Sequence, residues 1–186
     1  MTQEKQMKEK TRMMRTKKLT LCAMLISLAL ALAYAERFIP LQMVIPLPGI
    51  KLGLANIVTL VALYLLGTKS AFTILILRCF LGAVFGGGIT GLLFSMTGGL
   101  LSMAVMATAS RVPLFSIYGV SILGAAAHNV GQIGMAMILM QSVYVGTYLP
   151  YLLIVALFTG FATGSAGAGV LRIMKTVQRT EEGAGG

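Results

Sequence analysis

Six hydrophobic stretches, separated from one another by Gly, Pro and charged residues, account for most of the chain. They cover residues 19–38, 52–66, 70–86, 89–109, 116–141 and 147–170. A helix that stands upright in a hydrocarbon core of ~30 Å needs about 20 apolar residues, so the second and third stretches are short for a full crossing. The pattern predicts an all-α fold, an integral membrane bundle of six transmembrane helices.

The composition agrees with a chain whose main solvent is lipid. Hydrophobic residues make up 57% of the 186 residues, charged residues make up 11%, and the mean hydropathy is +0.88. A soluble domain of this length needs far less apolar material for one core. The chain has no Asp, and four of its five Glu lie in the terminal tails. Cys22 and Cys79 lie in apolar stretches and are expected to be small core residues.

The distribution of positive charge predicts an orientation. With a cytoplasmic N-terminus, twelve of the fifteen Lys and Arg fall on the cytoplasmic side and only Arg37 and Lys51 on the other. This asymmetry predicts a multi-pass protein of the cell membrane with both termini in the cytoplasm. The expected parts are a basic tail over 1–18, the transmembrane domain over 19–171 and a second tail over 172–186. Basic flanks suit anionic lipid headgroups, so the bilayer rather than nucleic acid is the expected partner.

The longest interruption is the segment 36–51, which reads ERFIPLQMVIPLPGIK. Its prolines remove backbone donors and disfavour helix at the preceding residues, so this outer loop between the first two helices is expected to be extended or turned. Because the loop is nearly as apolar as the helices, we expect it to fold back over the bundle and gate a binding cavity. The expected gating residues are Glu36, Pro46, Pro48 and Lys51. The alternative is a structural plug with no ligand beneath it.

Arg78 is the most informative polar residue inside a predicted span. It lies about eight residues into the third stretch, or roughly 12 Å along a helix. Glu36 is the only acidic residue outside the tails that could neutralise it. Arg78 therefore either reaches back to the interface, pairs with helix-end carbonyls, or helps to bind an anion.

The fifth stretch carries three polar residues in the sequence AAAHNVGQIG, namely His128, Asn129 and Gln132. His128 and Gln132 are four positions apart and share one helix face. Together with Asn56 and Arg78, these residues are the candidates for a substrate-binding pocket beneath the 36–51 segment. The alternative is a set of interhelical hydrogen bonds that only hold the bundle together. A single His without Cys, Asp or Glu beside it is a poor metal site, so no metal is expected.

Signatures of an enzyme do not occur in the sequence. There are no paired carboxylates, no nucleophile elbow, no zinc-protease helix and no nucleotide-binding loop. Acid–base catalysis and metal-assisted phosphate chemistry both lack their side chains here. We expect a protein that is not an enzyme and that needs no cofactor.

Several runs of the sequence carry a family resemblance. The runs LTLCAMLISLALALAYAERFIP, PGIKLGLANIVTLVALYLLGTKSAF, LRCFLGAVFGG and AAAHNVGQ together resemble the Gx transporter family, whose members often carry the label heptaprenyl diphosphate synthase component I. The resemblance covers about residues 17–175 and is most specific through PGIKLGLANIVTL. That family is similar to the substrate-binding S components of energy-coupling factor transporters, which are six-helix membrane proteins.

The resemblance implies partners as well as a fold. S components work with a transmembrane coupling protein and two cytoplasmic ATPases, which would supply the ATP hydrolysis that this chain cannot perform. Many pack against the coupling protein through an AxxxA pattern in the first helix. Ala23 and Ser27 stand at that spacing here, and Ser keeps the surface small although it departs from the pattern.

The synthase label implies a different role, which the sequence limits. Enzymes that elongate prenyl diphosphates hold Mg²⁺ with clusters of Asp, because hard cations require oxygen ligands. A chain without Asp cannot provide such clusters. The leading hypothesis is therefore the substrate-binding component of an uptake transporter for a small molecule. The alternative is a noncatalytic membrane partner of a prenyl synthase subunit in isoprenoid synthesis, in which Lys51 and Arg78 meet an anionic lipid intermediate.

Overall fold

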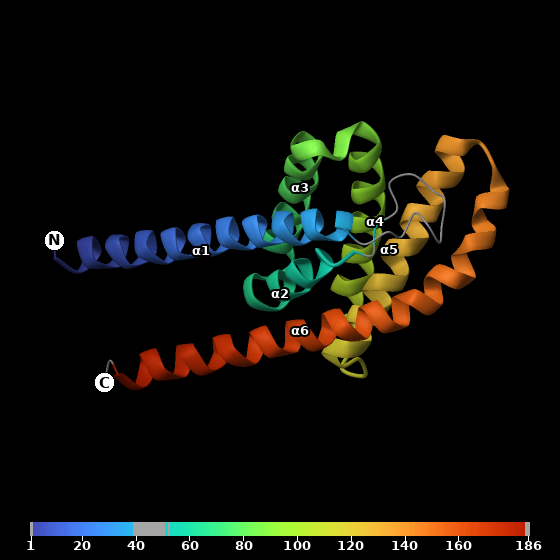
Figure 1. Cartoon of the computed structure of the whole chain (residues 1–186). Coiled ribbons are helices and arrows are strands. Elements are labelled where there is room, and N and C mark those ends of the chain that lie inside the picture. Colours follow the sequence, from blue (N-terminus) through green and yellow to red (C-terminus); the bar gives the residue numbers. More distant parts are fainter. Residues whose placement is uncertain (1, 39–50, 52, 185–186) are drawn as a thin grey trace.

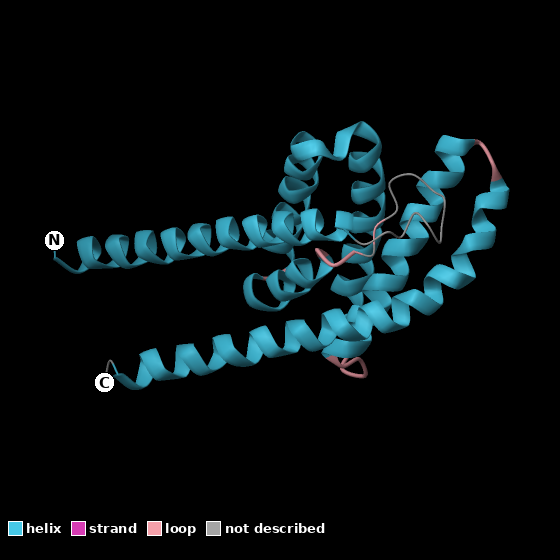
Figure 2. Ribbon diagram, in the orientation of Figure 1, coloured by secondary structure: helices cyan, strands magenta, loops and turns pink. Residues whose placement is uncertain are grey.

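The computed structural model describes residues 2–38, 51 and 53–184, and every regular element within these ranges is helical (Figures 1 and 2). The prediction of an all-α fold is confirmed for this part of the chain. The helices are α1 (Thr2–Ala35), η1 (Glu36–Phe38), α2 (Asn56–Leu66), α3 (Thr68–Gly82), η3 (Ala83–Gly87), α4 (Gly88–Ala109), α5 (Ile117–Met140), η4 (Val143–Tyr148) and α6 (Leu149–Ala184).

Glycine and polar caps set the ends of the inner helices. Gly67 separates α2 from α3 with φ of 80°, and Gly86 has φ of 109° in the reversal between α3 and α4. Positive φ of this kind favours Gly because a Cβ atom would be strained there. Ser116 caps the start of α5 by accepting a hydrogen bond from the Gly119 N–H. The local sequence thus explains where these helices begin and end.

Four segments are long and apolar enough to cross a membrane: Arg15–Ala35, Thr68–Ala109, Ile117–Met140 and Val143–Met174. The second of these contains the reversal at Gly86, so α3 and α4 form a hairpin rather than one straight rod (Figure 1). Helix α2 has 11 residues and is ~16 Å long, about half of the hydrocarbon thickness. The chain is therefore a helical membrane protein, and the number of full crossings stays a prediction.

Glycines allow α4, α5 and α6 to pack closely. A Cβ atom at Gly131 of α5 would lie 2.7 Å from the Thr97 carbonyl oxygen on α4, and one at Gly160 of α6 would lie 2.6 Å from the Ile122 Cα on α5. Small residues at such crossings let helix backbones approach where lipid offers little hydrophobic drive. The main apolar core lies between α1, α2, α3 and α4, and a second cluster around Phe94 joins α4, α5 and α6.

The two long helices α1 and α6 extend past the rest of the bundle, and the two termini lie on the same side of the molecule (Figure 1). The backbone of α1 continues as helix through the basic residues of the predicted N-terminal tail, and α6 continues through those of the C-terminal tail. The domain boundaries at 18 and 171 stay predictions. Pro46 and Pro48 of the predicted gating loop lie outside the described residues.

Candidate functional site

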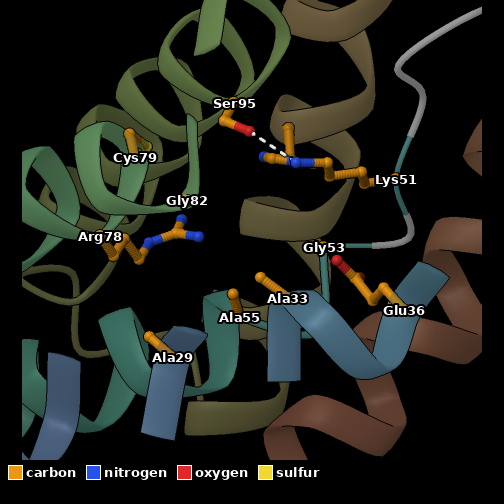
Figure 3. A pocket seen from close by; sticks show the side chains of 11 residues that line it. Ala29, Ala33, Glu36, Lys51, Gly53, Ala55, Arg78, Cys79, Gly82 and Ser95 are labelled. Atoms are coloured by element: carbon orange, nitrogen blue, oxygen red, sulfur yellow. Dashed lines mark hydrogen bonds between the residues drawn. The ribbon is translucent and has the colours of Figure 1, made fainter. Parts of the chain in front are cut away.

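A small polar cavity lies where the end of α1, the segment before α2, and helices α3, α4 and α5 meet (Figure 3). Its volume is about 20 Å³, which is room for about one water molecule. Its polar lining consists of Glu36, Lys51, Arg78, Ser95 and His128. Five separate parts of the chain therefore bring polar side chains to one enclosed point.

Arg78 enters this site from α3 and is 8% exposed. Its Nη2 donates to the Oδ1 of Asn56, the first residue of α2, at 3.1 Å. The Arg78 Nε and the Asn56 Nδ2 are both buried without a hydrogen-bond partner. Arg78 is therefore buried within the bundle, and its role in binding an anion stays a prediction. Two of the donors at this site lack an acceptor.

Glu36 follows the last residue of α1 and is also buried. Its Oε1 accepts a hydrogen bond from the Leu54 N–H. Burial raises the pKa of the Glu36 carboxyl, and this hydrogen bond and the positive charges of Lys51 and Arg78 offset part of the rise. Glu36 is the one acidic side chain that faces the two cations in the described part of the site.

Lys51 and the polar residues of α5 form a connected chain of hydrogen bonds. The Lys51 Nζ donates to the Ser95 Oγ of α4 at 3.1 Å (Figure 3). When the Gln132 amide is oriented with its nitrogen toward the Lys51 carbonyl, that nitrogen donates to the carbonyl at 3.0 Å, and the Gln132 oxygen accepts from the Lys51 N–H at 3.3 Å and from the His128 Nε2 at 3.2 Å. In this orientation the bonds hold the backbone of residue 51 against α5 and require the ring proton of His128 to be on Nε2.

Two glycines make room for the His128 ring. A Cβ atom at Gly53 would lie 3.1 Å from the His128 Cδ2, and one at Gly98 would lie 2.8 Å from its Nδ1. Gly53 also has φ of 81°, which favours Gly over other residues. His128 is 3% exposed between these two backbones. The position of the His128 ring therefore depends on Gly53 and Gly98, which a search of the sequence for polar residues does not identify.

The structure brings together four of the five predicted substrate-binding residues: Asn56, Arg78, His128 and Gln132. The fifth, Asn129, faces the other way, because its Nδ2 donates to the Leu152 carbonyl of α6 at 2.8 Å. That bond serves the packing of α5 against α6. Ser95 was missed by the sequence analysis, because it is one of five Ser and Thr residues in α4 and no motif distinguishes it from the others.

The predicted partner-packing residues lie on the surface of α1. Ala23 and Ser27 are both exposed, and the Ser27 Oγ donates to the Ala23 carbonyl within the helix. No neighbouring helix covers this face at these positions. The observation is compatible with a partner helix there, and the packing role stays a prediction.

The arrangement offers several kinds of group for binding a polar ligand. The site offers one carboxylate, two cations, amides, a hydroxyl and a neutral ring, and among the described residues no three of His, Cys, Asp and Glu lie together as metal ligands. Buried polar groups inside a membrane bundle are costly unless they serve packing or a ligand. The fold and the site together define a helical membrane protein with an enclosed polar pocket.

The family model described as heptaprenyl diphosphate synthase component I matches residues 25–170. The chain belongs to this family. The match includes every described residue that lines the pocket, from Ala29 to His128. No curated protein and no solved structure matches the chain.

Proposed function

We propose that this protein is a noncatalytic membrane component that captures a small molecule in the polar pocket, as the substrate-binding part of an energy-coupling-factor-like uptake transporter. The observation that carries the proposal is the enclosed pocket itself, where Arg78 and Asn56 keep buried donors without acceptors. Asn129, which faces α6 outside the pocket, is by contrast paired with the Leu152 carbonyl.

The proposal includes a topology of six spans with both termini in the cytoplasm. Twelve positive charges on one side support it. The pocket lies at the end of α1 remote from the N-terminus, which in this topology is the outer side (Figure 1). The segment 36–51 would cover the pocket, and its two ends, Glu36 and Lys51, both line it. A coupling protein would pack on α1 at Ala23 and Ser27.

The family description favours a second candidate function. A component I of heptaprenyl diphosphate synthase would be a noncatalytic membrane partner of a prenyl synthase subunit, without the Asp clusters that hold Mg²⁺. In that role the pocket would receive part of a prenyl diphosphate rather than a transported solute.

Co-purification from the native membrane separates the two candidates. The full chain would carry an affinity tag and be isolated in mild detergent, and its partners would be identified by mass spectrometry. Recovery with a transmembrane coupling protein and two ATPases would support the transporter. Recovery with a prenyl diphosphate synthase subunit instead would overturn it in favour of the accessory role.

The same experiment tests the packing face on α1. Ala23→Leu places a bulky side chain there, and the matched control Leu28→Ala changes another exposed position of the same helix. We expect Ala23→Leu to reduce recovery of the partner and Leu28→Ala to leave it unchanged. Equal recovery with both variants would remove this face from the proposal.

A further inference from the structure

The polar pocket has an excess of hydrogen-bond donors and of positive charge. Lys51 and Arg78 bring two cationic side chains, and Glu36 is the single carboxylate that faces them among the described residues. The Arg78 Nε and the Asn56 Nδ2 have no acceptor although both residues are more than nine-tenths buried. Buried donors are nearly always paired in folded proteins. The missing partner of these two nitrogens is an acceptor, and the two cations favour an anionic one; the His128 Nδ1 is a further buried atom without a partner in the same pocket.

Glu36 brings to the pocket the one carboxylate among its described lining residues. Its carboxylate comes from the end of α1, while the two cations come from α3 and from the segment before α2 (Figure 3). Its hydrogen bond to protein is made with the Leu54 N–H, not with the Arg78 guanidinium. The Arg78 guanidinium, which is suited to bind two oxygens side by side, donates to Asn56 through Nη2 and has no acceptor at Nε.

The pocket is too small for a ligand while Glu36 is in place. About 20 Å³ holds one water molecule, whereas a carboxylate or phosphate group is several times larger. Movement of the Glu36 side chain would free both space and positive charge at once.

We infer that the ligand of this pocket carries an anionic oxygen group, a carboxylate or a phosphate, which displaces the Glu36 carboxylate and binds between Arg78, Asn56 and Lys51. The inference rests on the proposed capture of a small molecule at this site, and it adds the chemical class of the ligand and the residue that competes with it. Glu36 acts as an internal counter-ion that keeps the empty pocket closed.

Replacement of Glu36 by an added anion tests this directly. In Glu36→Ala the carboxylate is removed, and acetate supplies the same group from solution; acetamide has nearly the same shape without the charge. Purified full chain in detergent would be titrated with each probe at constant ionic strength, and the midpoint of thermal unfolding would be measured. We expect acetate to raise the midpoint of Glu36→Ala at a concentration at least ~10-fold lower than that needed for wild type, because its competitor is gone.

Two variants show where the acetate binds. Arg78→Gln in the Glu36→Ala background should abolish the acetate response, whereas Arg111→Gln, which removes an exposed charge elsewhere, should leave it intact. If the Arg78 variant fails to fold, the comparison of acetate with acetamide on Glu36→Ala still decides. Equal midpoint shifts with acetate and acetamide would overturn the inference and would assign the orphan donors to a water molecule.

A second arm distinguishes a soluble anion from a lipid headgroup. Glu36→Ala in nanodiscs of phosphatidylglycerol would be compared with the same protein in phosphatidylcholine. A midpoint raised by phosphatidylglycerol, and no further by acetate, would support a lipid anion; a response to acetate in both lipids would support a soluble one. Loss of every anion response in a protein that still co-purifies with a coupling protein would overturn this inference alone and leave the transporter proposal standing.

Discussion

Gly98 of α4 is the position where one added carbon should disturb the polar pocket most cleanly. A Cβ atom there would lie 2.8 Å from the His128 Nδ1, 2.9 Å from its Cε1 and 2.9 Å from the His128 carbonyl oxygen. Ordinary contacts begin at 3.4 Å, so α4 and α5 must separate by roughly half an ångström or the ring must rotate. Rotation would break the bond from His128 Nε2 to Gln132 that helps to hold residue 51.

The expected cost follows from two opposing terms. Overpacking of a close helix crossing costs about 1–3 kcal/mol, and the replacement of Gly by Ala within a helix returns up to ~1 kcal/mol. We therefore expect Gly98→Ala to lower the free energy of unfolding by about 1–2 kcal/mol. For a chain of this size that corresponds to a fall of roughly 2–8 °C in the midpoint of thermal unfolding.

Gly91 provides the matched control, because it lies on the same helix and a Cβ atom there would meet nothing within 4 Å. Gly91→Ala should leave the midpoint unchanged or raise it slightly. The assay is thermal unfolding of both purified variants in the same detergent, followed by the fluorescence of a thiol-reactive dye at Cys79, which is buried in the folded protein. Equal stability of Gly98→Ala and Gly91→Ala would refute the claim that Gly98 of α4 lies too close to His128 for an added Cβ atom.

Three further changes test the surroundings of the pocket. Burial raises the pKa of Glu36 in the folded protein above its ordinary value of 4.5, so protonation of Glu36 stabilises the fold. This stabilisation is complete below pH 4.5. It is lost as the pH rises through the raised pKa of the folded protein. Glu36→Gln should remove this dependence, so the unfolding midpoint of the variant relative to that of wild type should rise as the pH increases above 4.5; a difference that is constant with pH would contradict the shift. Asn129→Ala should cost about 0.5–1.5 kcal/mol by removing its hydrogen bond to the Leu152 carbonyl, yet leave the acetate response of Glu36→Ala intact. Gly131→Ala, whose Cβ would meet backbone of α4 at 2.7 Å, should lower the unfolding midpoint, whereas Gly134→Ala with open space should not.

Much of the fold follows from local patterns in the sequence. Each of the six hydrophobic stretches contains an α-helix, with α2 and α3 as the two short ones, as their lengths predict. The reversal at residues 86–88 also follows from the sequence, because Gly tolerates the positive φ that Gly86 and Gly88 adopt. These features depend on hydropathy and on backbone sterics within a few residues, which a single sequence records well.

The pocket was predictable only in part. The i, i+4 spacing places His128 and Gln132 on one face, and the structure joins them at 3.2 Å. Asn129, one position further along, is turned by about 100° and faces α6 instead. The angle between adjacent side chains can be predicted from helix geometry, but the neighbouring helix that covers each face cannot. Asn129 was therefore predicted to line the pocket.

The sequence by itself determined that the chain is a helical membrane protein with a basic end and few polar residues in its spans, because hydropathy and charge act residue by residue. The tertiary structure decided which of those polar residues meet. Arg78 binds Asn56 from 22 positions away, and Lys51 meets Gln132 from 81 positions away. Such pairs depend on which helices cross and how closely, and that is set by packing at glycines such as Gly53 and Gly98. A hydrophobic pattern specifies a face, and only the packed bundle specifies what that face touches.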